Sequence, residues 1–170
     1  MNSRTIQVLF PQREHRFVPS LKTMKRKLLL VDDDPSVQKM LGRLLIAEGY
    51  QVLPAVNGQQ ALDLAAATEL DLVLLDLNLP VKNGWDTFER LTSENPLVPI
   101  IIITARPNQL FPALAAGVGA LMEKPLDFPR LLETIRGLLG EPMEERLARL
   151  TGKSDGFHYL PAQPKEESDQ

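Results

Sequence analysis

The segment Lys27-Leu28-Leu29-Leu30-Val31-Asp32-Asp33 joins an apolar run of strand length directly to a pair of carboxylates. This pattern is typical of a buried strand that ends at a polar edge of a sheet. Three later apolar runs end on or next to a chemically capable side chain: Leu72–Leu75 before Asp76, Ile100–Ile103 before Thr104, and Ala120–Met122 before Lys124. In an open parallel sheet, sites form at the carboxyl ends of the strands. The sequence therefore predicts that Asp32, Asp33, Asp76, Thr104 and Lys124 share one site.

Stretches with helical signals separate these apolar runs. Asp34-Pro35-Ser36 starts the first helix, with Asp34 as the N-cap and Pro35 at the first helical position. A further short strand is expected at about 51–53. Later helices are expected over about 57–68, 85–93 and 127–139, with a poor one near 109–116 that Pro112 weakens. Five nearly all-apolar strands separated by helices predict an α/β fold: a doubly wound, five-stranded parallel sheet with helices on both faces.

Length and composition fit one globular domain. The chain has 170 residues, of which 44% are hydrophobic, and it has no cysteine, which excludes disulfides and thiolate metal sites. No apolar stretch approaches the ~18 residues of a membrane helix. Residues 1–27 carry seven Lys/Arg and one acidic residue, and residues 28–170 carry twelve and twenty-one, giving net charges of +6 and −9. The acidic body disfavours direct nucleic-acid binding, and the composition agrees with a cytoplasmic location.

The composition also divides the chain into three parts. Residues 1–24 are expected to form a basic, disordered arm, which is either a leader or a surface that docks on a partner. The globular domain is expected over residues 25–140. Residues 141–170 are expected to contain one short amphipathic helix near 142–150, followed by a disordered polar tail.

The five side chains together suit a divalent cation and a phosphoryl group. Mg²⁺ prefers oxygen ligands, which Asp33 and Asp76 can supply directly and Asp32 partly through water. Crowded carboxylates repel one another, so an added cation is favoured. A carboxylate can also attack phosphorus to form an acyl phosphate, while a lysine and the metal neutralise the charge that is transferred.

Four sequence strings, in this order, resemble the receiver domains of two-component response regulators, the CheY-like family. They are Leu-Leu-Leu-Val-Asp-Asp-Asp-Pro-Ser (28–36), Asp-Leu-Val-Leu-Leu-Asp-Leu-Asn-Leu-Pro (71–80), Ile-Ile-Ile-Thr-Ala (101–105) and Glu-Lys-Pro-Leu (123–126). The resemblance covers about 26–139. It implies a flavodoxin-like strand order of 2-1-3-4-5, with each strand numbered along the chain, and a cis peptide bond between Lys124 and Pro125.

The resemblance also implies a role for each site residue. Asp76 would be the phosphoacceptor, with Lys124 and Thr104 contacting the phosphoryl group. Asp32, Asp33, Asp76 and the backbone carbonyl of Asn78 would hold Mg²⁺. The chain would not be a conventional enzyme, because it would catalyse only its own phosphorylation and dephosphorylation.

The chain departs from the family pattern in two places. Leu121 stands where the family commonly has Tyr or Phe, three residues before the lysine. The segment between Thr104 and Lys124 looks about two residues shorter than usual and contains Pro107 and Pro112. Both departures lie where the family usually signals, so the expected partner surface is unusual.

The resemblance implies a phosphorelay receiver. The roughly 30 residues after the last expected core helix are too few for a DNA-binding output domain, so we expect a stand-alone receiver. A histidine kinase or phosphotransfer protein would phosphorylate it, and it would then bind a downstream protein partner, with no DNA-binding output domain and no membrane contact. One alternative is a degenerate receiver that binds partners without a switch. Another is a haloacid dehalogenase-type phosphatase, because Asp32-x-Asp34 fits its nucleophile motif, but that function leaves Asp76 unexplained.

Overall fold

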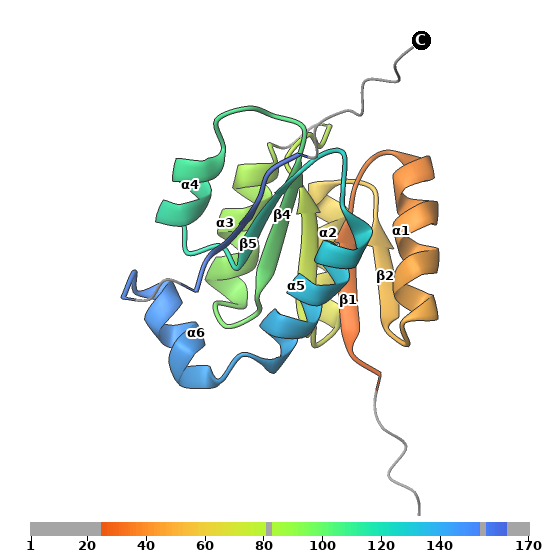
Figure 1. Cartoon of the computed structure of the whole chain (residues 1–170). Helices are drawn as coiled ribbons and strands as arrows, with labels where there is room; N and C mark the ends of the chain where they lie inside the picture. The colour runs from red at the N-terminus through yellow and green to blue at the C-terminus, as the bar shows by residue number, and fades with distance from the viewer. Residues whose placement is uncertain (1–24, 81–82, 154–155, 163–170) are drawn as a thin grey trace, which may run out of the picture.

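A computed structural model describes residues 25–80, 83–153 and 156–162. All strand pairs in its single sheet are parallel, and the strand order is β2-β1-β3-β4-β5-β6. The strands are β1 (Lys27–Val31), β2 (Gln51–Ala55), β3 (Leu72–Asp76), β4 (Ile100–Thr104), β5 (Ala120–Glu123) and β6 (His158–Leu160). The helices are α1 (Pro35–Ala47), α2 (Gly58–Ala67), α3 (Gly84–Glu94), α4 (Leu110–Ala115), α5 (Phe128–Gly140) and α6 (Met143–Leu150). Figure 1 shows their arrangement.

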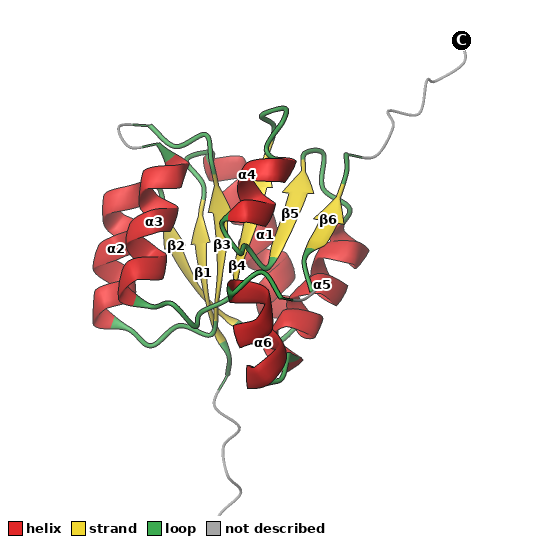
Figure 2. Ribbon diagram, turned by 90° about the vertical axis from the view of Figure 1, so that its left-hand side faces the viewer, coloured by secondary structure: helices red, strands yellow, loops and turns green. Residues whose placement is uncertain are grey.

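Two hydrophobic cores lie on opposite faces of the sheet. Successive residues of a strand point to opposite faces, so the apolar runs supply both cores at once. Leu29, Val73 and Ile102 pack with residues of α2, α3 and α4, whereas Leu28 and Leu74 pack with α1 and α5. Figure 2 shows the two helical layers with the sheet between them. The predicted doubly wound parallel fold is confirmed.

The structure corrects the expected number of strands. The sequence predicted five strands and a disordered tail after residue 150, but His158–Leu160 form β6, which pairs in parallel with β5 at the sheet edge (Figure 2). The strand was missed because it is only three residues long and follows a polar stretch. Leu160 explains its position, since this side chain is buried in the core shared by α1 and α5. The arm 1–24 and residues 163–170 of the predicted tail lie outside the described residues.

The predicted short helix near 142–150 is present as α6, and buried charged contacts hold it against the domain. The guanidinium of Arg149 is bound to both carboxylate oxygens of Glu141, at 3.0 and 2.8 Å, and donates to the Gly117 carbonyl at 2.9 Å. Arg149 is only 5% exposed. Arg146 adds hydrogen bonds to Glu141 and to the Leu97 and Leu138 carbonyls. These contacts hold α6 against the end of α5 and against the two loops that precede β4 and β5.

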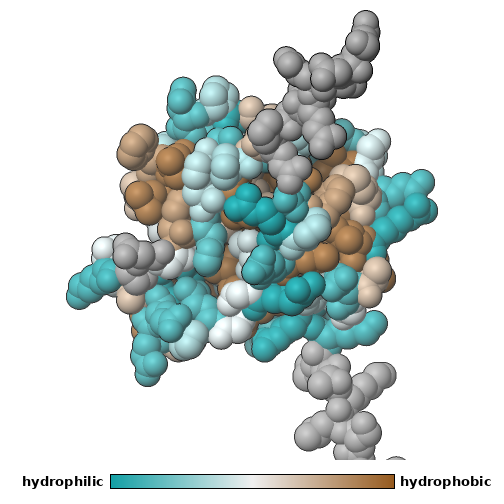
Figure 3. Space-filling view, viewed as in Figure 1, coloured by the Kyte–Doolittle hydropathy of each residue, from teal (hydrophilic) through white to brown (hydrophobic). Residues whose placement is uncertain are grey.

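Helix α4 exposes two large apolar side chains. Phe111 and Leu114 of α4 are 79% and 53% exposed, and Figure 3 shows hydrophobic surface over this helix. Among the described helices, none combines the length and the apolar character that crossing a membrane requires.

The Glu141–Arg149 pair predicts a pH-dependent stability. Burial raises the pKa of Glu141, but hydrogen bonds from Arg149 and Arg146 outweigh it and hold that pKa below its usual value of 4.5. Because the pKa of Glu141 is lower in the folded state, its ionised carboxylate stabilises the fold above pH 4.5. This stabilisation is lost as the pH falls through the folded-state pKa. We expect Glu141→Gln to lower the free energy of unfolding at pH 7 by about 3 kcal/mol, because it leaves Arg149 buried without its partner.

Urea unfolding at several pH values measures this effect. The difference between the wild type and Glu141→Gln should be constant from pH 7 down to about pH 5 and should shrink below pH 4.5. Glu145→Gln, at an exposed position of α6, is the control and should change little. A Glu141→Gln penalty that grows on acidification would contradict the assignment.

Candidate functional site

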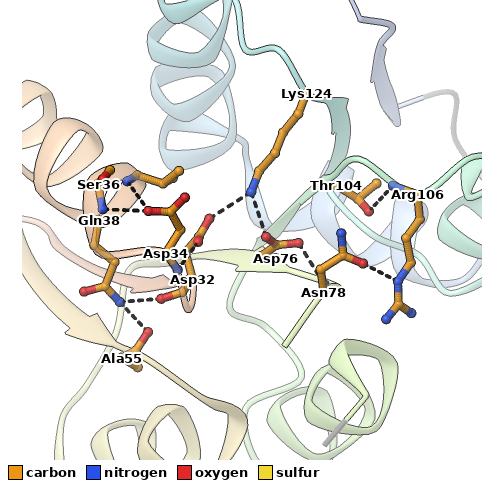
Figure 4. Close-up of polar contacts among 11 residues, drawn as sticks. Asp32, Asp34, Ser36, Gln38, Ala55, Asp76, Asn78, Thr104, Arg106 and Lys124 are labelled. Carbon is orange, nitrogen blue, oxygen red and sulfur yellow. Dashed lines mark hydrogen bonds and ion pairs between the residues drawn. The ribbon is translucent and has the colours of Figure 1, made fainter. Parts of the chain in front are cut away.

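The five predicted residues meet at the carboxyl edge of the sheet. Asp32 and Asp33 follow β1, Asp76 and Thr104 are the last residues of β3 and β4, and Lys124 follows β5. Parallel pairing aligns these ends, since Asp76 is in register with Ile103 and Thr104 with Glu123. Figure 4 shows Lys124 reaching over the sheet edge toward Asp32 and Asp76.

The Lys124 ammonium joins two of the three carboxylates. Its Nζ lies 2.7 Å from Asp76 Oδ2 and 3.0 Å from Asp32 Oδ2. Asp32 and Asp76 are 2% and 3% exposed, so both carboxylates depend on such partners. Burial lowers the pKa of Lys124, but the hydrogen bonds to Asp76 and Asp32 outweigh it and raise that pKa. The ammonium therefore stays charged at neutral pH.

The second oxygen of each buried carboxylate accepts a backbone hydrogen bond. Asp32 Oδ1 accepts the Asp34 N–H at 2.9 Å, and Asp76 Oδ1 accepts the Asn78 N–H at 2.8 Å. The pKa of Asp32 is raised, because burial together with the nearby Asp76 carboxylate outweighs the lowering by the Asp34 N–H and Lys124. The two backbone hydrogen bonds hold each carboxylate in one orientation. The raised pKa of Asp32 shows that its partners do not fully offset the cost of burying its negative charge.

The three carboxylates form a group that can hold a divalent cation. One oxygen each from Asp32, Asp33 and Asp76 lies within 4.8 Å of the others. Asp33 is exposed and borders the solvent, whereas the other two are buried. Hard oxygen donors with an open, solvated side are the set that Mg²⁺ takes, because it keeps several waters. The residues present therefore fit Mg²⁺, while the Asn78 carbonyl as a ligand stays a prediction.

Asp34 does not belong to this group. Its carboxylate caps α1 and accepts the N–H groups of Ser36 at 2.7 Å and Val37 at 3.4 Å. This confirms the predicted cap. The carboxylates of Asp34 and Asp32, on which the phosphatase alternative depended, thus have different partners, although the Asp34 N–H contacts Asp32.

Gln38 is a site residue that the sequence analysis missed. Its side-chain amide donates to the carbonyl of Asp32 at 2.8 Å and to that of Ala55 at 2.6 Å. The Ala55 carbonyl also accepts the Asp32 N–H at 3.1 Å. Gln38 thus fixes the acidic turn to the end of β2 from the first turn of α1 (Figure 4). Its position one turn after Asp34 was the only sequence signal, and it was too weak to stand out.

Thr104 and Arg106 form the other wall of the site. Thr104 is fully buried, and its Oγ accepts the Arg106 N–H at 2.9 Å. The Arg106 guanidinium donates to the side-chain oxygens of Asn78 and Asn83, with Nη1 3.2 Å from the latter. Arg106 therefore bridges the loops after β3 and β4. A cavity of about 390 Å³ opens here, lined by Thr104, Ala105, Arg106, Pro107, Asn108, Glu123, Lys124 and Ala162.

Gly84, the first residue of α3, lies against the backbone at the end of β3. A Cβ atom at this position would lie 2.4 Å from Leu77 Cα and 2.9 Å from the Asp76 carbonyl. Any larger residue would push α3 away from the end of β3. The peptide bond between Lys124 and Pro125 is cis, as the resemblance implied.

Comparisons with known proteins agree with this geometry. The family model of the response regulator receiver domain matches residues 28–136. The transcriptional regulatory protein CpxR of Escherichia coli K12 is 41% identical over 115 residues, covering 66% of this chain and 49% of CpxR. The chain thus spans about half the length of this relative.

Solved structures show the same fold. A CheY-like receiver domain protein from Methanospirillum hungatei aligns with a TM-score of 0.65 and 27% identity, covering 72% of this chain and 97% of that one. The receiver domain of the sensor histidine kinase PA1611 from Pseudomonas aeruginosa aligns with a TM-score of 0.64 and 28% identity, covering 69% and 99%. That structure has a magnesium ion coordinated in its active site cleft. With the family match over most of the sheet and the acidic edge in place, this chain belongs to the response regulator receiver domain family.

Proposed function

We propose that this receiver domain accepts a phosphoryl group on Asp76 and signals through a change in its protein-binding surface. The observation that supports this most directly is the pairing of Asp76 with Lys124 at 2.7 Å, beside two further carboxylates. Asp76 is the only one of the three that lies at the centre of the set, between the acidic turn after β1 and the Thr104 wall (Figure 4). Asp32 and Asp33 then serve the cation.

The transfer step follows from the position of Asp76. One carboxylate oxygen forms a bond to phosphorus as the bond from phosphorus to the imidazole nitrogen of a donor phosphohistidine breaks, and the nitrogen leaves with that electron pair. Lys124 supplies positive charge to the transferred oxygens, and the Asn78 N–H holds the other Asp76 oxygen. A bound Mg²⁺ would supply further charge neutralisation at the same oxygens. Thr104 can turn its hydroxyl toward the phosphoryl group by giving up its bond to Arg106.

The proposed partners are a histidine kinase or phosphotransfer protein as donor and a downstream protein as receiver of the signal. The location consistent with such donors is the cytoplasm. The domain turns over only its own phosphoryl group and is not an enzyme on other substrates. The alternative is a receiver that binds partners without a phosphorylation switch. Leu121 and the short segment before Lys124 favour it, because both depart from the family pattern in the region that usually signals.

Phosphorylation of Asp76 is tested directly by intact mass. With Mg²⁺ and acetyl phosphate, we expect the wild type to gain one phosphoryl mass and Asp76→Asn to gain none, because the amide is not a nucleophile. Asp34→Asn keeps an oxygen that can cap α1, lies outside the carboxylate group, and is the matched control that should still be labelled. Labelling that survives in Asp76→Asn would refute the assignment. Mg²⁺ binding without any labelling of the wild type would favour the unswitched module.

Gln38 is expected to act as a positioning residue for the acidic turn. Gln38→Leu leaves the Asp32 and Ala55 carbonyls without their side-chain donor, which costs about 1–3 kcal/mol of unfolding free energy. We also expect weaker Mg²⁺ binding by calorimetry, because the ligands lose their fixed orientation. Lys39→Leu, at an exposed position of the same helix, should leave both quantities nearly unchanged. If Gln38→Leu lowers stability but Mg²⁺ affinity stays at the wild-type value, the role is purely structural.

Arg106 is expected to protect the phosphoryl group from water. Its guanidinium crosses the mouth of the site between Asn78 and Asn83. We expect Arg106→Ala to shorten the lifetime of the phosphorylated form by up to about tenfold, or about 1.4 kcal/mol in barrier height. The measurement is the decay of the phosphorylated mass after the donor is removed. Arg90→Ala, an exposed position on α3, is the control, and an unchanged or longer lifetime in Arg106→Ala would argue against this role.

A further inference from the structure

The segment after α6 occupies the sheet edge next to the site. It lies beyond residues 28–136, to which the family match extends. Strand β6 pairs with the whole register from Ala120 to Met122, and the His158 N–H donates to the Gly119 carbonyl at 3.2 Å. Leu160 enters the core on the α5 side, and Phe157 packs against the opposite core. The edge of β5 is therefore covered by this chain's own C-terminal segment.

Glu123, the last residue of β5, joins this segment to the end of the sheet. Its carboxylate accepts the Tyr159 hydroxyl at 2.9 Å and the Ala162 N–H at 3.2 Å. The hydrogen bond with Glu123 raises the pKa of Tyr159, which keeps the phenol a donor over the neutral range. Tyr159 is in register with Leu121, the position where the family commonly has an aromatic residue. The hydrogen bonds of Tyr159 and Ala162 thus meet at one acidic side chain.

The same residue borders the phosphoryl site. Glu123 is bonded in the chain to Lys124, and it is in register with Thr104. The Lys124 N–H also donates to the Thr104 carbonyl at 2.9 Å. Ala162 lines the cavity that Thr104, Arg106 and Lys124 share. A movement of the Thr104–Asn108 loop or of Lys124 therefore changes the wall against which the C-terminal segment rests.

We propose that Phe157–Ala162 is a self-docked occupant of the β5 edge, and that it loosens when Asp76 is phosphorylated. This inference rests on the proposed function of Asp76. The segment is docked in a structure in which Thr104 bonds Arg106 and Lys124 bonds both Asp32 and Asp76. A phosphoryl group on Asp76 would draw the Thr104 hydroxyl away from Arg106 and the Lys124 ammonium away from Asp32. It would thereby destabilise the conformation in which the segment is docked.

The segment is short enough to detach and rebind reversibly. Strand β6 has three residues and lies at the sheet edge, where local opening is easiest. Leu160 is buried and holds the segment in the resting state, whereas Tyr159 is exposed and depends on its bond to Glu123. Coupling between two sites is commonly about 5- to 150-fold in an equilibrium constant, enough to shift such a local opening without unfolding the domain. Once loosened, the segment uncovers the hydrogen-bonding edge of β5 for an extended segment of a protein partner.

Hydrogen exchange on the full-length chain tests this coupling. The wild type and Asp76→Asn are incubated with Mg²⁺ and acetyl phosphate, and intact mass reports phosphorylation in the same samples in which peptides covering residues 157–162 report exchange. We expect exchange in these peptides to accelerate by about fivefold or more in the phosphorylated wild type and to stay unchanged in Asp76→Asn.

Tyr159→Phe tests the route through Glu123. This variant removes only the hydroxyl, so we expect faster exchange of residues 157–162 before phosphorylation and a smaller further increase after it. Tyr50→Phe, the chain's other tyrosine, is the matched control and should behave as wild type. Phosphorylated wild type with unchanged or slower exchange overturns the inference, and so does a Tyr159→Phe variant that exchanges as wild type does. Absence of phosphorylation on the wild type instead overturns the proposed function, and the inference with it.

Discussion

The arrangement of the site depends on one ammonium group held between two buried carboxylates. Asp32 and Asp76 are removed from water by the same sheet that places them, and each would be costly as an isolated charge. Lys124 binds both from the end of β5, at 3.0 and 2.7 Å, although β4 lies between β5 and β3. The ion pairs thereby connect the ends of β1, β3 and β5 across the carboxyl edge. They also leave a net negative set of side chains, which favours an additional cation.

The apolar strands make this concentration of charge tolerable. Burial of both faces of the sheet fixes the strand ends in register, so the polar residues that follow have little freedom to separate. Gly84 and Gln38 then tighten the two loops that matter most, one after β3 and one after β1. The backbone N–H groups of Asp34 and Asn78 complete the orientation of the carboxylates. The acidic side of the site is thus held by backbone and Gln38 hydrogen bonds, and the Thr104 side is held through Arg106.

The sequence was sufficient to predict the sheet and the residues that meet at its edge, because apolar runs of strand length ended on Asp32, Asp76, Thr104 and close to Lys124. It was insufficient for contacts that join segments distant in the chain. Gln38 acts through backbone carbonyls of β1 and β2, and Arg106 acts through two asparagines, and neither leaves a periodic signal. The prediction missed strand β6 for a related reason. Three residues are too few to show alternation, and only the open edge of β5 makes them a strand.

The path of the chain after α5 returns to the cavity that Thr104 and Lys124 line. Helix α5 ends at the opposite edge of the sheet from the acidic group, and Arg149 anchors α6 there (Figure 1). Because β6 runs parallel to β5, it carries the chain back, and Ala162 ends beside the cavity shared by Thr104 and Lys124. Whatever polypeptide follows Ala162 is therefore joined to the domain beside this cavity. A short tether sets a local concentration in the millimolar range, so even a weakly binding sequence attached there would compete effectively with proteins that arrive by diffusion.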